Sequence, residues 1–448
     1  MRIKIESTNE KITRRSGMIL TNEFGKRIEV SRIVDEEFPR PGSNHGFAAS
    51  RYVTTLVEMF HDGALYLEDV RHLMSDHAYQ ELVANDGYPT SDAIGDWLRR
   101  RGETGGEEHT WNVQRRVLAL FEKMHTPKKN ALHTKPIAEE KRVSESEVQY
   151  TLDIDATIIE CEKGDATKTY KNSWGYQPLL AIIAENGVVA GCDFRLGHHS
   201  PQSGLRDFVR RCEATVPWRI DCIRSDSAGY NKSLIEDIMD RRRFFTITAD
   251  HTTAVLEAIE AIAPEQWKHG VRGDGVRAEW DVAETTHTFS SKKKTFRLVV
   301  KRTPLDAQGD LFVRYTYWIV ATNLPADRYD ANRVILYHQG RGEMEKTIGE
   351  LKHHWNLDHM PCGQYKANAL YFTIGLFAYN LMQMVKMLTL PEEAVKKSVR
   401  TIRYQLLHLA GRVIRHARYL LVRLAAPPER VQELAEMYLR LHLSPIPL

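Results

Sequence analysis

The stretch from residue 149 to residue 249 constrains the fold most, because strand-like and helix-like segments alternate there in a definite order. Three apolar segments of strand length come first: TLDIDATIIE, QPLLAIIAE and GVVAGCDFRL. They are followed by helix, strand, helix and strand patterns over SPQSGLRDFVRRCEATV, WRIDCIRSD, NKSLIEDIMDRRR and RFFTITA. Five strands, with helices between the later ones, predict a mixed sheet flanked by helices, hence an α/β protein.

The order of strands and helices in residues 149–249 is that of a ribonuclease-H-like fold. The rest of the chain is predicted to form further segments before and after this stretch. Residues 1–148 are predicted to be a helical region that ends in a charged linker, and its helices could read DNA or be purely structural. Residues 149–249 form the first part of the core, and residues 250–325, where aromatic and basic residues alternate, form a β-strand insertion. Residues 326–390 complete the core, and residues 391–448 are predicted to be a basic helical C-terminal region.

The composition fits a soluble protein with several domains. Of the 448 residues 42% are hydrophobic, which is enough for real cores, and the net charge of +3 neither requires nor excludes nucleic acid. The five cysteines form no Cys-x-x-Cys pair, which argues against a zinc or disulfide framework. No apolar segment reaches the ~20 residues that span a bilayer, and the N-terminus has no apolar signal region. We therefore expect a cytoplasmic, nucleoid-associated protein without a membrane partner.

One helix in the second part of the core, RGEMEKTIGELK, carries an acid between two cations. At ~100° per residue, Arg341, Glu345 and Lys352 lie within ~40° of one another on the helical wheel. Glu343 and Glu350 fall on the opposite side. A row of exposed charge pairs is the commoner cause of such a pattern. A carboxylate between two phosphate-binding cations is, however, what a metal-dependent enzyme acting on a nucleic-acid backbone requires.

Two strands of the core supply further acids. Asp153 and Asp155 are two residues apart in the first strand and therefore point to the same face of the sheet. Asp226 ends the fourth strand just before a glycine turn, where open α/β sheets place their ligand contacts. Each acid alone could merely cap a strand or a helix. Together with Glu345 they predict a site for Mg²⁺ ions, for which Mn²⁺ can substitute, and phosphoryl transfer.

Two further segments are rich in basic residues, and we expect both to contact the phosphates of double-stranded DNA. In the insertion, the alternative is an edge hairpin protected by lysines. In the C-terminal region no acid lies between residues 396 and 423, and the alternative is packing on an acidic side of the same domain. The insertion residues are Lys292, Lys293, Lys294 and Arg297. The C-terminal residues, which form one stripe if the segment is a helix, are Arg412, Arg415 and Arg418.

The Arg–x3–Glu–x6–Lys spacing of residues 341–352 resembles the signature of DDE transposases of bacterial insertion sequences, in the cut-and-paste group with a Y-R-E-K motif. The tyrosine of that motif falls at His338 in this chain. The family's first acid stands before a small residue and a threonine, which favours Asp155 over Asp153. The segment CIRSDSAG resembles the strand that carries the family's second acid.

The resemblance implies an enzyme that binds the terminal inverted repeats of its own element, cleaves DNA with water and joins the 3′-hydroxyl ends to target DNA. The acids that act in catalysis and bind the metal would be Asp155, Asp226 and Glu345, and the DNA-binding residues beside them His338, Arg341 and Lys352. Relatives work as homodimers in a synaptic complex. In relatives with a β insertion an aromatic side chain stacks on a flipped base, for which Trp280 and Trp318 are the candidates here.

Two other functions fit parts of the pattern. A transposase-derived DNA-binding protein without catalytic activity would keep the DNA-binding parts, but the presence of all three acids argues against it. A structure-selective nuclease could share the fold. Such nucleases are usually smaller, however, and they lack the β insertion and the Arg–Glu–Lys helix.

Overall fold

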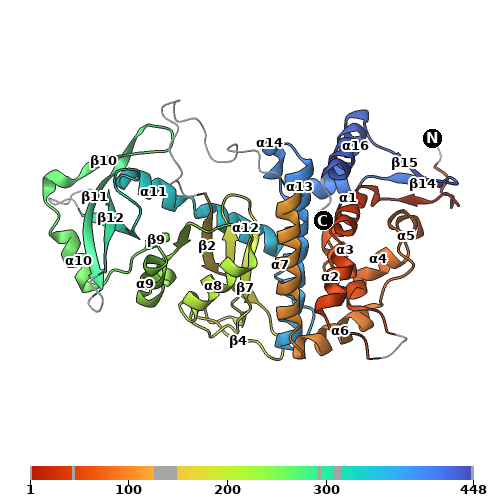
Figure 1. The fold of residues 1–448 in the computed structure, drawn as a ribbon, viewed down its shortest axis with the longest axis horizontal. Coiled ribbons are helices and arrows are strands. Elements are labelled where there is room, and N and C mark those ends of the chain that lie inside the picture. Colours follow the sequence, from red (N-terminus) through yellow and green to blue (C-terminus); the bar gives the residue numbers. More distant parts are fainter. Residues whose placement is uncertain (1–2, 43–45, 126–148, 290–293, 306–313, 445–448) are drawn as a thin grey trace. The chain divides into compact units, whose positions relative to one another are not determined.

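The computed structural model describes residues 3–42, 46–125, 149–289, 294–305 and 314–444 (Figure 1). Most of the predicted charged linker, together with Lys292 and Lys293, lies outside these residues. Contacts divide the chain into two units that interleave in sequence. The sheet unit comprises residues 134–158 and 177–347, and the helical unit comprises residues 1–133, 159–176 and 348–448.

The sheet unit is built on a mixed sheet of nine strands, counted over the described residues, in the order β10-β11-β12-β13-β9-β8-β2-β6-β7. The strands are β2 Thr151–Ala156, β6 Leu179–Ile183, β7 Val189–Asp193, β8 Cys222–Ser225, β9 Phe244–Thr248, β10 Lys268–Val271, β11 Arg277–Phe289, β12 Lys294–Pro304 and β13 Tyr315–Thr322. β2 pairs antiparallel with β6 and parallel with β8, which is itself parallel to β9. This arrangement confirms the predicted α/β class and the predicted order of elements.

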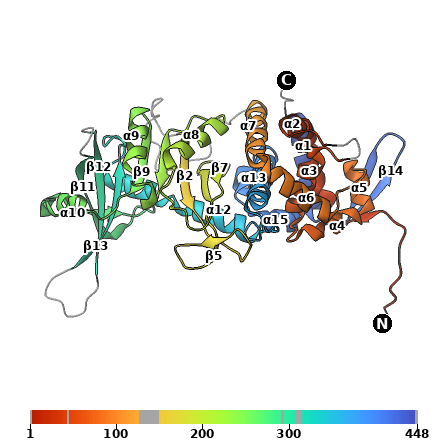
Figure 2. The same ribbon diagram turned by 90° about the horizontal axis from the view of Figure 1, so that it is seen from below.

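The local sequence explains these elements. Every residue of β6 and of β8 is buried, as expected for central strands that are covered on both faces. Two helices connect the later strands, α8 Leu205–Thr215 and α9 Lys232–Asp240, and they contact each other beside the sheet (Figure 2). α9 begins at an N-cap, since Asn231 Oδ1 accepts hydrogen bonds from the backbone nitrogens of Ser233 and Leu234.

The strands that we expected in the insertion extend the core sheet. β13 pairs antiparallel with β9, and β12, β11 and β10 follow in order. A helix that the sequence analysis did not give, α10 Thr253–Glu260, precedes these strands. Helix α11 Ala331–Gln339 packs Val334 and Ile335 against Val299 and Val320 of the sheet. The insertion therefore shares its hydrophobic core with the helix that leads into the predicted acid-bearing helix, α12 Gly342–His353.

The helical unit is organised around α13 Tyr365–Thr389, which is buried along nearly its whole length. The other helices of this unit are α1 Ile19–Arg27, α2 Val30–Glu37, α3 Ala49–Asp62, α4 Val70–Met74, α5 His77–Val83, α6 Ser91–Glu103, α7 Gly106–Met124, α14 Glu392–Val395, α15 Val399–Ile402 and α16 Pro428–Leu443. α3, α6 and α7 pack directly on α13. Among the helices described, none is long and apolar enough to cross a membrane.

Two small sheets of the helical unit were not predicted. The first expected strand was drawn to residue 160, but β2 ends at Ala156, and β3 Ile159–Glu160, β4 Thr167–Lys168 and β5 Trp174–Tyr176 form a separate sheet. The predicted basic helix is wrong for residues 411–424, which form a hairpin of β14 Gly411–Arg415 and β15 Leu420–Leu424 (Figure 1). β14 also pairs with β1 Ile12–Thr13, about 400 residues earlier, a partner that local periodicity cannot reveal.

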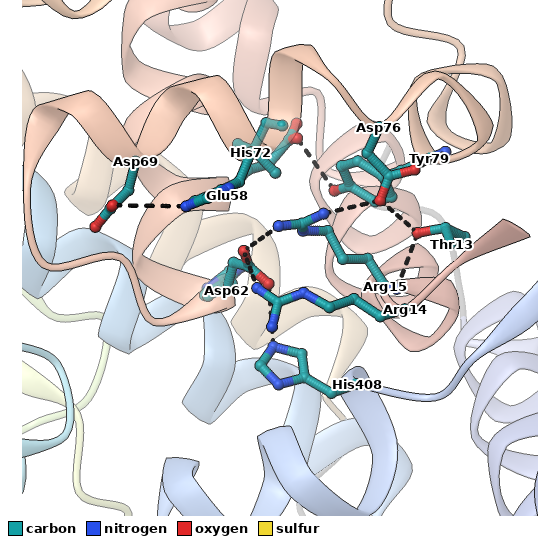
Figure 3. A network of polar contacts seen from close by, with 12 residues as sticks. Thr13, Arg14, Arg15, Glu58, Asp62, Asp69, His72, Asp76, Tyr79 and His408 are labelled. Carbon is teal, nitrogen blue, oxygen red and sulfur yellow. Dashed lines mark hydrogen bonds and ion pairs between the residues drawn. The ribbon is translucent and has the colours of Figure 1, made fainter. Parts of the chain in front are cut away.

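A buried ionic network fixes this N-terminal strand to the helices (Figure 3). Arg15 donates hydrogen bonds of 2.8 Å to both Asp62 at the end of α3 and Asp76 at the start of α5. His408 Nε2 lies 3.1 Å from the other oxygen of Asp62, and Thr13 Oγ1 donates to Asp76. The network thus joins the N-terminal strand, two helices and the segment before β14, and the nearby positive charges hold the pKa of Asp62 below its usual value against the opposing effect of burial.

Candidate active site

β2, β8 and α12 each position one of the three predicted acids, and all three acids lie in the sheet unit. Asp155 is the penultimate residue of β2, Asp226 directly follows β8, and Glu345 lies in the first turn of α12. The two strands are parallel neighbours, with Ile154 opposite Ser225. Asp155 and Asp226 therefore stand at the same edge of the sheet, at the carboxyl ends of adjacent central strands.

Arg341 connects two of the acids. Its Nη1 donates to Asp155 Oδ2 over 3.1 Å, and its Nη2 donates to Glu345 Oε1 over 3.0 Å. The Asp155 side chain is 18% exposed and the Glu345 side chain 60% exposed, so the bridge runs from a largely buried carboxylate to an accessible one. One guanidinium thus occupies the position between the first and third predicted acids.

The negative charges of Asp226 and Glu345 both act on Asp155. Burial, followed by the negative charge of Asp226, raises the pKa of Asp155 to about 6; Glu345 acts in the same direction, and Arg341 opposes the rise. Mutual repulsion of this kind is what a divalent cation relieves, and three carboxylates are the hard oxygen donors that Mg²⁺ prefers. The donor set therefore fits such an ion. As they now lie, however, no three His, Cys, Asp or Glu side chains of the described chain are arranged to hold one.

Asp226 also acts as a cap, as the simpler interpretation of its sequence predicted. Its Oδ1 accepts a 3.0 Å hydrogen bond from the backbone nitrogen of Ala228 in the turn Ser227–Gly229. Ser225 Oγ lies 3.4 Å from the same oxygen. The cap uses Oδ1 alone, so capping the turn is compatible with a second role for this carboxylate.

A buried ion pair holds the acid-bearing segments in register. Asp153 is 1% exposed and accepts two hydrogen bonds from Arg224, of 2.5 Å to Oδ1 and 2.7 Å to Oδ2. Arg224 Nη1 also donates to the backbone oxygen of Tyr337 over 2.6 Å. β2, β8 and the end of α11 are joined in this way two to four residues before Asp155, Asp226 and Arg341.

Gly340 allows this arrangement. A Cβ atom at residue 340 would lie 2.6 Å from Arg224 Nη1 and 3.0 Å from the Tyr337 oxygen, closer than a side-chain carbon can approach. The Tyr337 hydroxyl is 2.5 Å from Thr151 Oγ1 at the start of β2. Tyr337 therefore fixes the junction between α11 and α12 to two strands: its backbone oxygen bonds Arg224 of β8, and its hydroxyl bonds Thr151 of β2.

Sequence comparison now decides the family, since a family model described as Transposase DDE domain group 1 matches residues 1–445. The chain belongs to this family. No curated protein matches the chain. The family implies a DNA-cleaving enzyme, and DDE transposases generally use divalent metal ions.

In this member of the family, the residue at the tyrosine position of the expected motif does not reach the surface. His338 is 1% exposed, and its ring nitrogens lie 3.1 Å from Thr246 Oγ1 and 3.0 Å from Thr248 Oγ1. Burial lowers its pKa to about 3, so the imidazole is neutral. The expected DNA contact of His338 is not supported, because this face of α11 packs on β9.

Lys352 follows Glu345 on the same continuous helix, as the spacing predicted. The helix passes from the sheet unit into the helical unit between these two residues. Lys352 is partly buried, and burial lowers its pKa while the negative charges of Asp358 and Glu160 oppose that effect. Lys171 of the same unit acts with burial, so both acidic and basic side chains of its own unit surround Lys352.

Of the four insertion residues that we expected to bind DNA, Lys294 and Arg297 are described, and both are bonded within the sheet unit. Lys294 contacts Asp240 and the backbone oxygen of Glu236. Arg297 bonds Glu284 and the backbone oxygens of Leu324 and Tyr329. Both side chains support the fold rather than an exposed DNA-binding face. The edge-hairpin alternative does not describe them either, because β12 is an interior strand that pairs with both β11 and β13.

The two tryptophans that we named for base stacking are also engaged. Trp280 and Trp318 pack against the cluster that contains Val282, and Lys301 Nζ lies 5.0 Å and 5.7 Å from the two ring centroids. Both rings are only partly exposed. Their packing role is evident, whereas a stacking role stays a prediction.

The C-terminal arginines lie on and beside the β14–β15 hairpin of the helical unit. Arg412 pairs with Glu10 at 3.0 Å and Arg415 with Glu81 at 2.6 Å. Arg418 is exposed in the turn between the strands. The alternative of packing on acidic residues of the same domain therefore describes Arg412 and Arg415, although both remain substantially exposed.

The residues that position the site, Asp153 and Arg224, are not identified by the sequence pattern alone. Arg224 was noted only as part of a motif around Asp226, and Asp153 was left as an alternative first acid. The available signal was a pair of opposite charges in two otherwise apolar strands. Such charges are unlike the rest of a central strand and require partners there.

Proposed function

We propose that this protein is an active transposase that binds the terminal inverted repeats of a mobile element, cleaves the DNA there and joins the 3′-hydroxyl ends to target DNA. Asp155, Asp226 and Glu345 act as the metal-binding, catalytic carboxylates. The observation that carries the proposal is geometric: Asp155 and Asp226 stand at the ends of adjacent parallel strands, and Arg341 hydrogen-bonds to both Asp155 and Glu345.

The reaction that this site would perform is phosphoryl transfer. In cleavage, a water oxygen forms a bond to phosphorus and the bond from that phosphorus to the 3′-oxygen breaks. In joining, the released 3′-hydroxyl oxygen forms a bond to a target phosphorus, and the bond from that phosphorus to the target's own 3′-oxygen breaks, leaving a 3′-hydroxyl on the target strand. Bound divalent ions, Mg²⁺ or Mn²⁺, would activate the attacking oxygen and stabilise the leaving oxygen. Asp155 is mostly ionised at neutral pH, as a metal ligand must be, because its pKa is about 6.

Double-stranded DNA is the proposed partner, and two copies of the chain are proposed to act together on it. Arg341 is hydrogen-bonded to two of the acids, and Lys352 follows seven residues after Glu345 on the same helix. Arg418 and, on release from their acidic partners, Arg412 and Arg415 could bind phosphates farther along the duplex. We do not assign Lys294 or Arg297 to DNA, because their donors are used within the fold.

A catalytically silent DNA-binding derivative is the second candidate. The observation in its favour is that no metal-holding group of side chains is preformed in the described part of the chain. Such a protein would bind element ends without cutting them under either Mg²⁺ or Mn²⁺.

Cleavage of a labelled duplex that carries the element's own terminal sequence tests the proposal, with Mg²⁺ and with EDTA. We expect metal-dependent cuts at the repeat boundary for the wild type and none for Glu345→Gln, with end binding retained. Glu343→Gln is the matched control, because this acid lies in the same helical turn and is paired with Lys346 at 2.7 Å. Full cleavage by Glu345→Gln would show that Glu345 is not the third acid. Binding without cleavage by the wild type would favour the silent derivative.

A further inference from the structure

The hydrogen bonds from Arg341 to Asp155 and Glu345 would affect metal binding if these acids are the metal ligands, as the proposed function on which this inference rests assumes. Asp155 and Glu345 come from a strand and from a helix almost 200 residues away, and one guanidinium hydrogen-bonds to both. A bound cation would need carboxylate oxygens from the same two residues. The guanidinium and the metal therefore compete for the same negative charge.

The competing cation cannot be removed by titration. An arginine keeps its charge at any physiological pH, so only a different anion can draw Arg341 away. A DNA phosphate is such an anion, because its oxygens match the planar donors of a guanidinium in geometry and in charge. Arg341 is accessible to it, with a side chain 21% exposed beside a carboxylate that is 60% exposed.

We infer that Arg341 is a specificity-determining residue that makes metal loading depend on bound DNA. In the free protein it neutralises Asp155 and Glu345 and lowers the affinity of the site for a divalent ion. A phosphate at the scissile position takes over the guanidinium, and the carboxylates it leaves then attract the ion. By reciprocity, a loaded metal also strengthens the binding of DNA by the same factor.

This coupling would restrict hydrolysis to the correct substrate. A protein that carries its metal ions permanently could attack any phosphodiester that reaches the acids. With Arg341 in the bridging position, the free protein instead holds its own cation between two of its catalytic groups. The metal site is assembled only when a DNA phosphate replaces the two carboxylates as the ion-pair partner of the Arg341 guanidinium.

Mn²⁺ titration of the full-length protein, followed by the loss of the free-ion EPR signal, tests this inference. The DNA is a duplex that already ends at the cleavage position, so that no cut follows. For the wild type we expect Mn²⁺ affinity to rise about 5- to 150-fold when this duplex is added, the usual range for coupled sites. Arg341→Gln should bind Mn²⁺ more tightly than the wild type without DNA and should gain little on its addition.

Lys346→Gln is the matched control, since it removes one positive charge from the same helix next to Glu345 but does not bridge the acids. It should behave as the wild type. Equal Mn²⁺ affinity of Arg341→Gln and wild type in the absence of DNA would overturn the inference. Asp155→Asn separates this failure from that of the proposed function: if Asp155→Asn leaves Mn²⁺ binding unchanged, the metal site itself is wrongly assigned.

Discussion

Asp153 and Arg224 form a buried ion pair between the two strands that carry the first and second predicted acids. Two hydrogen bonds join the side chains, and a third connects Arg224 to the backbone oxygen of Tyr337. Both oxygens of the Asp153 carboxylate are therefore used within the fold, although Asp153 is in the same strand and on the same face as Asp155. Its position instead determines where the strand ends and the helix junction lie relative to one another.

Breaking one side of this pair should be costly. For Asp153→Ala we expect a loss of about 3–5 kcal/mol in the free energy of unfolding, because a guanidinium is left buried without its carboxylate. Denaturant unfolding measures this loss. The double variant Asp153→Leu with Arg224→Met removes both charges and should recover much of the stability. If Asp153→Ala alone unfolds like the wild type, the pair does not hold the strands together.

A single methyl group at residue 340 should disturb the same junction. In Gly340→Ala the new Cβ would lie 2.6 Å from Arg224 Nη1, so the guanidinium must move away from the Tyr337 oxygen. We expect a destabilisation of about 1–3 kcal/mol, as for other overpacked sites. The accompanying shift of Arg341 should reduce cleavage.

Gly342→Ala is the matched control for that change. No neighbouring atom lies within 4 Å of a Cβ at this position, and the residue begins α12. Alanine has the higher helix propensity, so stability should rise by about 0.4–1 kcal/mol. Thermal unfolding of the two variants side by side checks both expectations. Equal effects at the two positions would contradict the proposed close approach.

The parts of the fold that could be predicted are those that depend on the pattern of residues within a single strand or helix. β6 is an apolar run of five residues before a turn, and Glu345 lies at a fixed spacing from Arg341 and Lys352 on one helix. The hairpin of residues 411–424 was missed because arginines every three residues also suit a helix. Its strand character depends on pairing with Ile12 and Thr13, far away in sequence.

The burial of individual side chains and the partners they contact were the least predictable features of the site. His338 matched a motif position, yet its burial follows from the packing of α11 on β9, which no spacing encodes. Arg224 was conspicuous as a charge in a strand, but its partner could have been Asp153 or Asp155. Only the register of two parallel strands, with Asp153 opposite Arg224, selects between them.

The carboxyl group of Glu58 should make the stability of the helical unit depend on pH. Glu58 is buried and accepts a hydrogen bond of 3.1 Å from the hydroxyl of Tyr79 (Figure 3). It accepts another, of 2.6 Å, from the hydroxyl of Tyr88. Burial nevertheless raises its pKa from 4.5 to about 7. The folded protein thus holds this proton more tightly than the unfolded chain does, and stability is lost as the pH rises from about 4.5 to about 7.

Glu58→Gln removes this titration while keeping an oxygen acceptor for the two phenols. We expect the melting temperature of the wild type to fall over that pH interval by more than that of the variant. Glu68→Gln, at an exposed position of the same unit, should leave the wild-type profile unchanged. Parallel profiles for wild type and Glu58→Gln would show that Glu58 does not titrate in this range.

The arginines of the β14–β15 hairpin provide the remaining prediction, which separates DNA binding from internal pairing. Each phosphate contact that is lost lowers the slope of log affinity against log salt concentration by about 1. If Arg412 and Arg415 exchange Glu10 and Glu81 for phosphates, then Arg412→Ala with Arg415→Ala should reduce the slope by about 2. Arg418→Ala alone should reduce it by about 1, since Arg418 is exposed in the turn. Fluorescence anisotropy at several salt concentrations measures the slope. An unchanged slope with a lower melting temperature would mean that Arg412 and Arg415 serve only to attach the hairpin to Glu10 and Glu81.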